Sequence, residues 1–134
     1  MTLLDELPPR TALVVDDSFS MRSILARLLG AIGWTCRDAA DGWQALEVLR
    51  AGWVPDVVLV DWNMPVMSGL DLLRAVRGDA GYAGLRLVVV SSEADPVVVG
   101  EALDAGADEY LVKPFTADAL ASKLELVAPR RWSL

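Results

Sequence analysis

The chain alternates short runs of apolar residues with longer segments of helical periodicity. The strongest apolar runs, Thr11–Val15, Val57–Val60 and Leu87–Val90, are short and rich in Val and Leu, a pattern typical of parallel strands that are buried on both faces. Two weaker runs, Thr35–Asp38 and Glu109–Val112, are expected to form the second and fifth strands. The pattern therefore predicts one sheet with a strand for each of these runs.

Helical segments follow each predicted strand. The first should end at Gly33, because glycine is common just after a helix. Six of its apolar residues recur at helical spacing and should face the sheet: Met21, Ile24, Leu25, Leu28, Leu29 and Ile32.

The other helices carry recognisable start signals. A capping side chain precedes three of them, and a proline fits the first turn of the fourth helix. In the third helix we expect Leu70, Leu73 and Val76 to face the sheet. The start signals, in chain order, are Asp41, Ser68, Pro96 and Thr116.

Strands that alternate with helices imply an α/β fold with a doubly wound parallel sheet covered on both faces. With right-handed crossovers, the common solution for five strands and five helices is the flavodoxin-like order 2-1-3-4-5. The first and third strands are then central neighbours, and the chain reverses its direction between them. Ligands of such sheets bind outside the carboxyl ends of the strands, at this reversal. The residues just after the strands are therefore the candidates for chemistry.

Composition narrows the possible functions. A length of 134 residues fits one domain, and a formal net charge of −7 argues against a nucleic-acid groove and for cations or basic partners. No apolar run approaches the roughly 18 residues of a membrane span. The first ten residues lack the apolar middle of a secretory signal, and the single cysteine, Cys36, suits a reducing cytoplasm. The chain has no His, which excludes histidine-based catalysis and His metal sites within it.

Polar residues gather at the predicted strand ends. Asp16 and Asp17 follow the first strand, Asp61 the third, Ser91 the fourth and Lys113 the fifth. Like charges about 4 Å apart repel by roughly 4 kcal/mol per pair at an effective dielectric of 20, so three carboxylates in one pocket need cations among them. One lysine neutralises one charge, and oxygen ligands without His or Cys suit Mg²⁺ for the rest.

A Mg²⁺ site with a lysine is suited to phosphate. The metal and Lys113 would neutralise the oxygens of a transferring phosphoryl group, and Ser91 would donate a hydrogen bond to it. A carboxylate held in line can act as the nucleophile. Asp61 is the best placed for this, because it is central and is the lone acid after its strand.

Together these motifs resemble the receiver domain of two-component response regulators, from about Thr11 to Val127. The closest resemblance is to the chemotaxis-type single-domain members, which share the Asp-Trp-Asn-Met-Pro run and a Tyr three residues before the Lys. The motifs that carry the resemblance are Asp16-Asp17, Val60-Asp61-Trp62-Asn63-Met64-Pro65, Gly69, Ser91, Tyr110 and Lys113-Pro114-Phe115.

The resemblance implies how the pocket works. Asp61 would accept a phosphoryl group from a phosphohistidine on a sensor histidine kinase or a histidine phosphotransfer protein. Asp17 and Asp61 would bind Mg²⁺ directly, with the backbone carbonyl of Asn63 as the third protein ligand. Asp16 would act through a bound water, and Lys113 would pair with the phosphoryl group.

The resemblance also implies a switch. Ser91 would move toward the phosphoryl group, and Tyr110 would turn inward into the space vacated. Asn63 and Glu93 occupy the two positions that tune self-dephosphorylation in this family, and their identities are those of short-lived members.

Main-chain features are implied as well. The backbone at Trp62 and Ser92 would contact the phosphoryl group, and the Lys113–Pro114 bond would be cis. A cis bond is costly except before proline.

The resemblance predicts a stand-alone cytoplasmic receiver, monomeric, with no nucleic-acid or membrane partner. It would not be an enzyme for an external substrate, because it catalyses only its own phosphotransfer and slow self-dephosphorylation. Phosphorylation would shift a pre-existing equilibrium, so that the face formed by the fourth helix, fifth strand and fifth helix binds a downstream protein. A flagellar motor switch or a kinase are the candidate targets. A relay intermediate or a phosphate sink without an output of its own are the alternatives.

Two other phosphate-related classes fit less well. A phosphatase of the haloacid dehalogenase type needs a second Asp two residues past the nucleophile, where this chain has Asn63. A flavodoxin carries a loop rich in Ser, Thr and Gly after its first strand, whereas Asp16-Asp17 would repel the flavin phosphate.

The chain divides into an N-terminal extension (residues 1–10), the receiver domain (11–128) and a short tail (129–134). The tail is basic and aromatic, and it is either a frayed terminus or a docking segment for an anionic partner.

Overall fold

The computed structural model describes residues 7–129, which form one parallel sheet with strand order β2-β1-β3-β4-β5. This is the predicted flavodoxin-like order. The second strand extends one residue further than expected, and Ser91, expected just after the fourth strand, is its last residue. The strands are β1 (Thr11–Val15), β2 (Thr35–Ala39), β3 (Val57–Val60), β4 (Arg86–Ser91) and β5 (Glu109–Val112).

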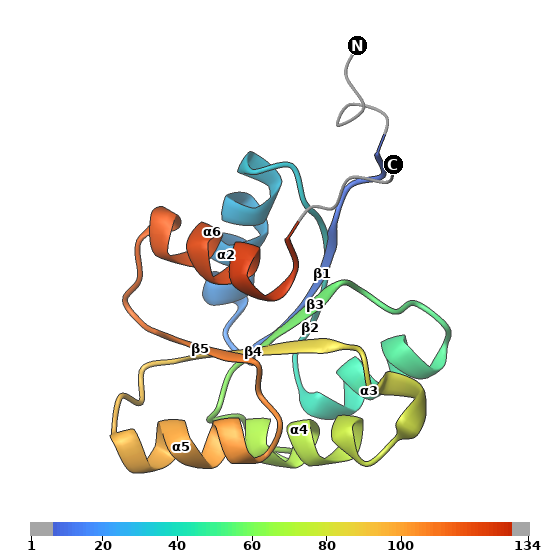
Figure 1. The fold of residues 1–134 in the computed structure, drawn as a ribbon, viewed down its shortest axis with the longest axis vertical. Helices are drawn as coiled ribbons and strands as arrows, with labels where there is room; N and C mark the ends of the chain where they lie inside the picture. The colour runs from blue at the N-terminus through green and yellow to red at the C-terminus, as the bar shows by residue number, and fades with distance from the viewer. Residues whose placement is uncertain (1–6, 130–134) are drawn as a thin grey trace.

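Helices cover both faces of the sheet (Figure 1). Helices α2 and α6 lie on one face, and α3, α4 and α5 lie on the other. A short 3₁₀ helix, η1 (Ala80–Tyr82), was not predicted. The result is two apolar layers, one on each face of the sheet. Successive side chains along a strand point alternately into one layer and the other. The helices are α2 (Phe19–Ala31), α3 (Gly42–Arg50), α4 (Gly69–Arg77), α5 (Pro96–Asp104) and α6 (Ala117–Val127).

The predicted helix starts are confirmed. Asp41, Ser68 and Thr116 each accept a hydrogen bond from the backbone N–H three residues further on, and Pro96 opens α5. Ser18 caps α2 in the same way, which the sequence analysis did not anticipate. These caps satisfy backbone donors that the first turn of a helix leaves free.

Two predictions about buried helix faces were partly wrong. In α2 only Leu25 and Leu29 are buried, whereas Ile24 and Ile32 are 45% and 42% exposed. Ile24 lies about 100° around the helix from Leu25 at 3.6 residues per turn, and Ile32 lies past the last helical residue. In α4 the buried leucines are Leu72 and Leu73, whereas Leu70 is only half-buried. The reason is that the helix face against the sheet is centred between Leu72 and Val76.

Arg10, the last residue of the predicted N-terminal extension, packs against the end of α6. Its Nη1 donates to Glu125 Oε1 at 2.6 Å and to the carbonyl oxygen of Ala128 at 3.0 Å. Its guanidinium also lies 4.7 Å from the ring centroid of Trp34. Arg10 is therefore part of the folded domain, while residues 1–6 and most of the predicted tail (130–134) lie outside the described residues.

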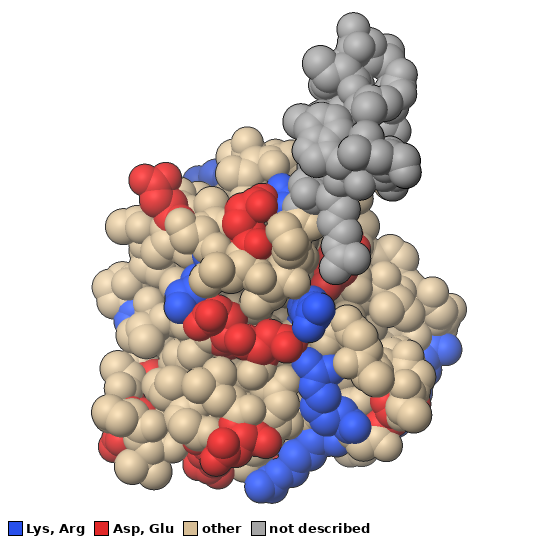
Figure 2. All heavy atoms as spheres, in the orientation of Figure 1, with Lys and Arg blue, Asp and Glu red and all other residues tan. Residues whose placement is uncertain are grey.

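Charges of both signs are exposed side by side. On the face shown in Figure 2, Lys and Arg side chains stand next to Asp and Glu side chains. Among partly buried side chains, ion pairs such as Lys123–Glu109 and Arg77–Asp108 join opposite charges. On the same face, a continuous run of Lys and Arg side chains extends over the lower half of the molecule. Within residues 7–129, no helix has the length and apolar character needed to cross a membrane.

Arg77, at the end of α4, ties this helix to the amino ends of β4 and β5. Its Nε donates to the Gly106 carbonyl oxygen at 3.0 Å, and its Nη1 donates to those of Leu85 and Tyr82 at 2.7 and 3.3 Å. Its Nη2 lies 2.9 Å from Asp108 Oδ2. One guanidinium thus serves three carbonyls and a carboxylate at the side of the sheet opposite to the acidic strand ends.

We expect Arg77→Ala to lower the free energy of unfolding by about 2–4 kcal/mol, because it removes the side-chain donor of the Gly106 and Leu85 carbonyls and one of the charged partners of Asp108. Arg74→Ala is the control, since Arg74 is exposed on the same helix and its loss should cost less than about 0.5 kcal/mol. Urea denaturation of both variants measures the difference. Equal stability of the two variants would contradict the role of Arg77.

Candidate functional site

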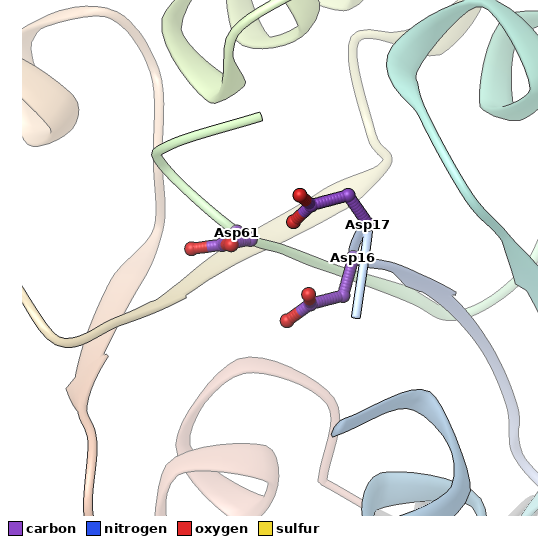
Figure 3. A group of neighbouring side chains, drawn as sticks. All are labelled: Asp16, Asp17 and Asp61. Carbon is purple, nitrogen blue, oxygen red and sulfur yellow. The ribbon is translucent and has the colours of Figure 1, made fainter. Parts of the chain in front are cut away.

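Three carboxylates meet at the carboxyl ends of β1 and β3. The register pairs Val15 with Val60, so Asp16 and Asp61 leave adjacent strands at the same level, and Asp61 N donates to the Val15 carbonyl oxygen at 2.9 Å. Figure 3 shows the side chains of Asp16, Asp17 and Asp61 projecting to the same side. One oxygen of each lies within 4.8 Å of the others.

Lys113, just after β5, reaches into this acidic cluster. Its Nζ lies 3.0 Å from Asp16 Oδ2 and 3.8 Å from Asp61 Oδ1. Asp16 is buried, and the side chains of Asp61 and Lys113 are 12% and 18% exposed. The main chain of Lys113 is held beside the end of β4, because Lys113 N donates to the carbonyl oxygen of Ser91 at 2.8 Å. Three negative charges therefore face one positive charge in a largely desolvated site.

This surplus of negative charge acts on Asp61. Burial raises the pKa of its carboxyl, and the neighbouring Asp16 and Asp17 add to the rise. Lys113 and the backbone N–H of Asn63 counteract it only in part. The ionised form of Asp61 is thus destabilised in the protein without another cation.

The donor set fits Mg²⁺. It consists of carboxylate oxygens from Asp16, Asp17 and Asp61, and it contains neither the imidazole nor the thiolate that zinc prefers. Asp17 is exposed, so one ligand is reachable from solvent. A dication here would offset the remaining negative charge and would help to hold a phosphoryl group beside Lys113.

Ser91 and Tyr110 lie behind the cluster and share a contact with Glu93. Ser91 is fully buried, and its Oγ accepts a hydrogen bond from Glu93 N at 3.1 Å. The Tyr110 hydroxyl donates to the Glu93 carbonyl oxygen at 2.6 Å, with the ring buried against the core. The residues expected to form the switch are therefore linked through the first residues of the β4–α5 loop.

The loop after β3 brings its backbone close to Asp61. A Cβ at Gly69 would lie 2.8 Å from the Cα of Trp62 and would also clash with the Asp61 carbonyl oxygen, which explains the glycine of the motif. Trp62 is half-buried beside the core, while Asn63 and Ser92 are exposed. The Lys113–Pro114 peptide bond is cis.

Comparison with known proteins identifies this arrangement. The family model of the response regulator receiver domain matches residues 12–125. The chain belongs to this family.

Its relatives include proteins named as chemotaxis proteins. The chain is 44% identical to the chemotaxis protein CheY of Pseudomonas aeruginosa over 119 residues, which cover 88% of this chain and 95% of the relative. It is 41% identical to the chemotaxis protein CheY1 of Helicobacter pylori over 116 residues, 86% and 94% of the two chains. The solved structure of the chemotaxis response regulator CheY4 of Vibrio cholerae superposes with a TM-score of 0.83 at 34% identity, covering 90% of this chain and 99% of that one.

One residue beside the receiver site escaped the sequence analysis. No role was predicted for Arg22 of α2, yet its Nη1 donates to the carbonyl oxygen of Asp16 at 2.8 Å. Its Nε donates to Asp38 Oδ2 at 2.9 Å, at the end of β2. Helical spacing cannot show such a contact, because it depends on how α2 sits against two strand ends.

We expect Asp61→Asn to raise the free energy of unfolding at pH 7, in the absence of Mg²⁺, by about 1–2 kcal/mol. Because its pKa is raised, Asp61 holds its proton more tightly in the folded state than in the unfolded chain. The stability of the wild type therefore falls as the pH rises from the ordinary pKa of Asp to the raised pKa of the folded protein. The gain of the variant should therefore shrink as the pH falls toward about 4, the range of an unfolded Asp. Urea denaturation in EDTA at both pH values measures it. A variant less stable than wild type at pH 7 would contradict the repulsion.

Proposed function

We propose that the protein is the receiver of a His-Asp phosphorelay and that Asp61 is its phosphoacceptor. The proposal is supported chiefly by the convergence of Asp16, Asp17, Asp61 and Lys113 in one site, which is largely buried except at Asp17. It makes the chain a signalling protein and not an enzyme acting on an external substrate.

In the reaction, a carboxylate oxygen of Asp61 attacks the phosphorus of a phosphohistidine. A P–O bond forms as the P–N bond breaks, and the imidazole of the donor leaves with the electron pair and is protonated. Lys113 Nζ, within 4 Å of Asp61, stabilises the charge on the phosphoryl oxygens. Ser91 donates a hydrogen bond to the product once its hydroxyl turns from Glu93.

The metal set assigned to the site is Asp17 and Asp61 with the backbone carbonyl of Asn63, while Asp16 acts through a water. Mg²⁺, when bound, supplies positive charge that offsets the acids and the phosphoryl oxygens. Asp16 fits the indirect role because Lys113 already occupies one of its carboxylate oxygens. Asp17 fits the direct role because it is exposed.

The output is assigned to the face formed by α5, β5 and α6. Tyr110 lies in β5, and its hydroxyl donates a hydrogen bond to the loop that leads into α5. A movement of Ser91 toward the phosphoryl group would therefore change the positions of residues on this face. Leu103 and Val112 are 45% and 38% exposed and supply apolar contact area. A partner that prefers the phosphorylated form gains affinity by shifting the population.

Asn63 and Glu93 are proposed to set the lifetime of the phosphoryl group, and the backbone at Trp62 and Ser92 to contact it. Asn63 and Ser92 are exposed and Glu93 is half-buried, so these positions are reachable by the water that hydrolyses the product. The phosphoryl group would be short-lived.

The pathway we favour is chemotaxis, on the names of the relatives. A monomeric cytoplasmic protein would take phosphate from a sensor histidine kinase or a histidine phosphotransfer protein and bind a flagellar motor switch or a kinase. A relay intermediate or a phosphate sink would use the same site without that output.

We expect wild-type protein to incorporate label from ³²P-acetyl phosphate with Mg²⁺ and not with EDTA. Asp61→Asn should incorporate none, because the amide is not a nucleophile for this step. Asp71→Asn, at an exposed acid on α4, should be labelled as wild type. Labelling that persisted in Asp61→Asn would refute the assignment of the phosphoacceptor.

Tryptophan emission offers a test of the metal site. Trp62 follows Asp61, so adding Mg²⁺ and then beryllofluoride, a phosphoryl mimic, should change its fluorescence. Trp62→Phe should lose this response, and Trp43→Phe, at a 51% exposed position on α3, should keep it. The reverse result would place the ion elsewhere.

A further inference from the structure

Arg22 lies between the ends of β1 and β2 and bonds both. Its Nη1 donates to the backbone carbonyl oxygen of Asp16 at 2.8 Å, and its Nε donates to Asp38 Oδ2 at 2.9 Å. The Arg22 side chain is 14% exposed, whereas that of Asp38 is 58% exposed. The largely buried guanidinium of Arg22 is thus held on its solvent side by the Asp38 carboxylate. On its inner side it donates a hydrogen bond to the Asp16 carbonyl oxygen.

That carbonyl belongs to the peptide unit joining Asp16 to Asp17. Because a peptide unit is planar, holding its oxygen fixes the plane from which both acidic side chains project. Arg22 therefore contacts no metal-binding oxygen, but it bonds the one backbone group shared by the two residues.

The two acids differ in how much else restrains them. Asp16 Oδ1 accepts a hydrogen bond from Ser18 N at 2.9 Å, and Asp16 Oδ2 lies 3.0 Å from Lys113 Nζ. Within residues 7–129, the Asp17 carboxylate makes no such bond and is exposed. The direction of the Asp17 side chain thus depends on the backbone, and so on the bond from Arg22.

We propose that Arg22 is a positioning residue of the phosphorylation site: by holding the Asp16–Asp17 peptide plane from α2, it aims the Asp17 carboxylate for Mg²⁺. This inference rests on the proposed function. Partners that orient metal ligands commonly change metal affinity by about 10–100-fold when they are removed.

The sign of the effect separates positioning from electrostatics. A positive charge near a cation site repels the cation, so removing Arg22 should tighten Mg²⁺ binding if charge alone mattered. If Arg22 positions Asp17, the same change weakens binding. Lysine keeps the charge but is a point donor and lacks the fork that bonds Asp38 and Asp16 together.

The experiment is a Mg²⁺ titration followed by tryptophan emission, at a temperature where far-UV circular dichroism shows every variant folded. We expect Arg22→Gln to raise the apparent Kd for Mg²⁺ by about tenfold or more, and Arg22→Lys to stay several-fold weaker than wild type. Arg27→Gln is the matched control, because it removes the same charge from an exposed position on α2 and should change the Kd less than about twofold.

Asp38→Asn provides a second route if Arg22→Gln does not fold. Loss of the anchor should raise the Kd several-fold even in about 1 M KCl, where the Debye length is only about 3 Å and charge alone counts for little. Binding by Arg22→Gln as tight as wild type or tighter would overturn the inference, as would an unchanged Kd in Asp38→Asn at high salt. If the tryptophan emission of the wild type did not respond to Mg²⁺, both the role of Arg22 and the proposed function would be contradicted.

Discussion

Repulsion among three carboxylates at two neighbouring strand ends is the constraint on which the site depends. The sheet order makes β1 and β3 adjacent, and the register sets Asp16 and Asp61 at one level. One lysine cannot balance three acids, so the site is prepared for a dication and for phosphate. The fold concentrates negative charge at this site and only partly neutralises it.

The surroundings of the site divide its acids by role. Asp16 is buried and held by Ser18 and Lys113, and it supplies a fixed negative charge. Asp61 is partly buried, and burial, with a smaller contribution from Asp16 and Asp17, raises the pKa of its carboxyl. Asp17 is exposed and restrained mainly through the backbone that Arg22 bonds. Fixed, reactive and reachable carboxylates thus come from three different environments.

Few contacts join the site to the β4–α5 loop and to β5. Ser91 and Tyr110 both bond the main chain of Glu93, one as acceptor and the other as donor. These two bonds connect Ser91, at the end of β4, and Tyr110, in β5, to the start of the β4–α5 loop. At the opposite side of the sheet, Arg77 holds α4 against the segments before β4 and β5.

Local signals in the sequence were enough to predict the strands, the helix caps at Asp41, Ser68 and Thr116, and the family. The strand order followed from the common topology of five strands that alternate with helices. The sequence also predicted that the acids and Lys113 would share one end of the sheet. Only the tertiary structure decided that Ile24 stays exposed, that Leu72 and not Leu70 is buried, and that Arg22 and Arg77 bond distant carbonyls. Those outcomes depend on how a helix is rotated and placed against the sheet. Residue spacing along one segment carries no information about that placement.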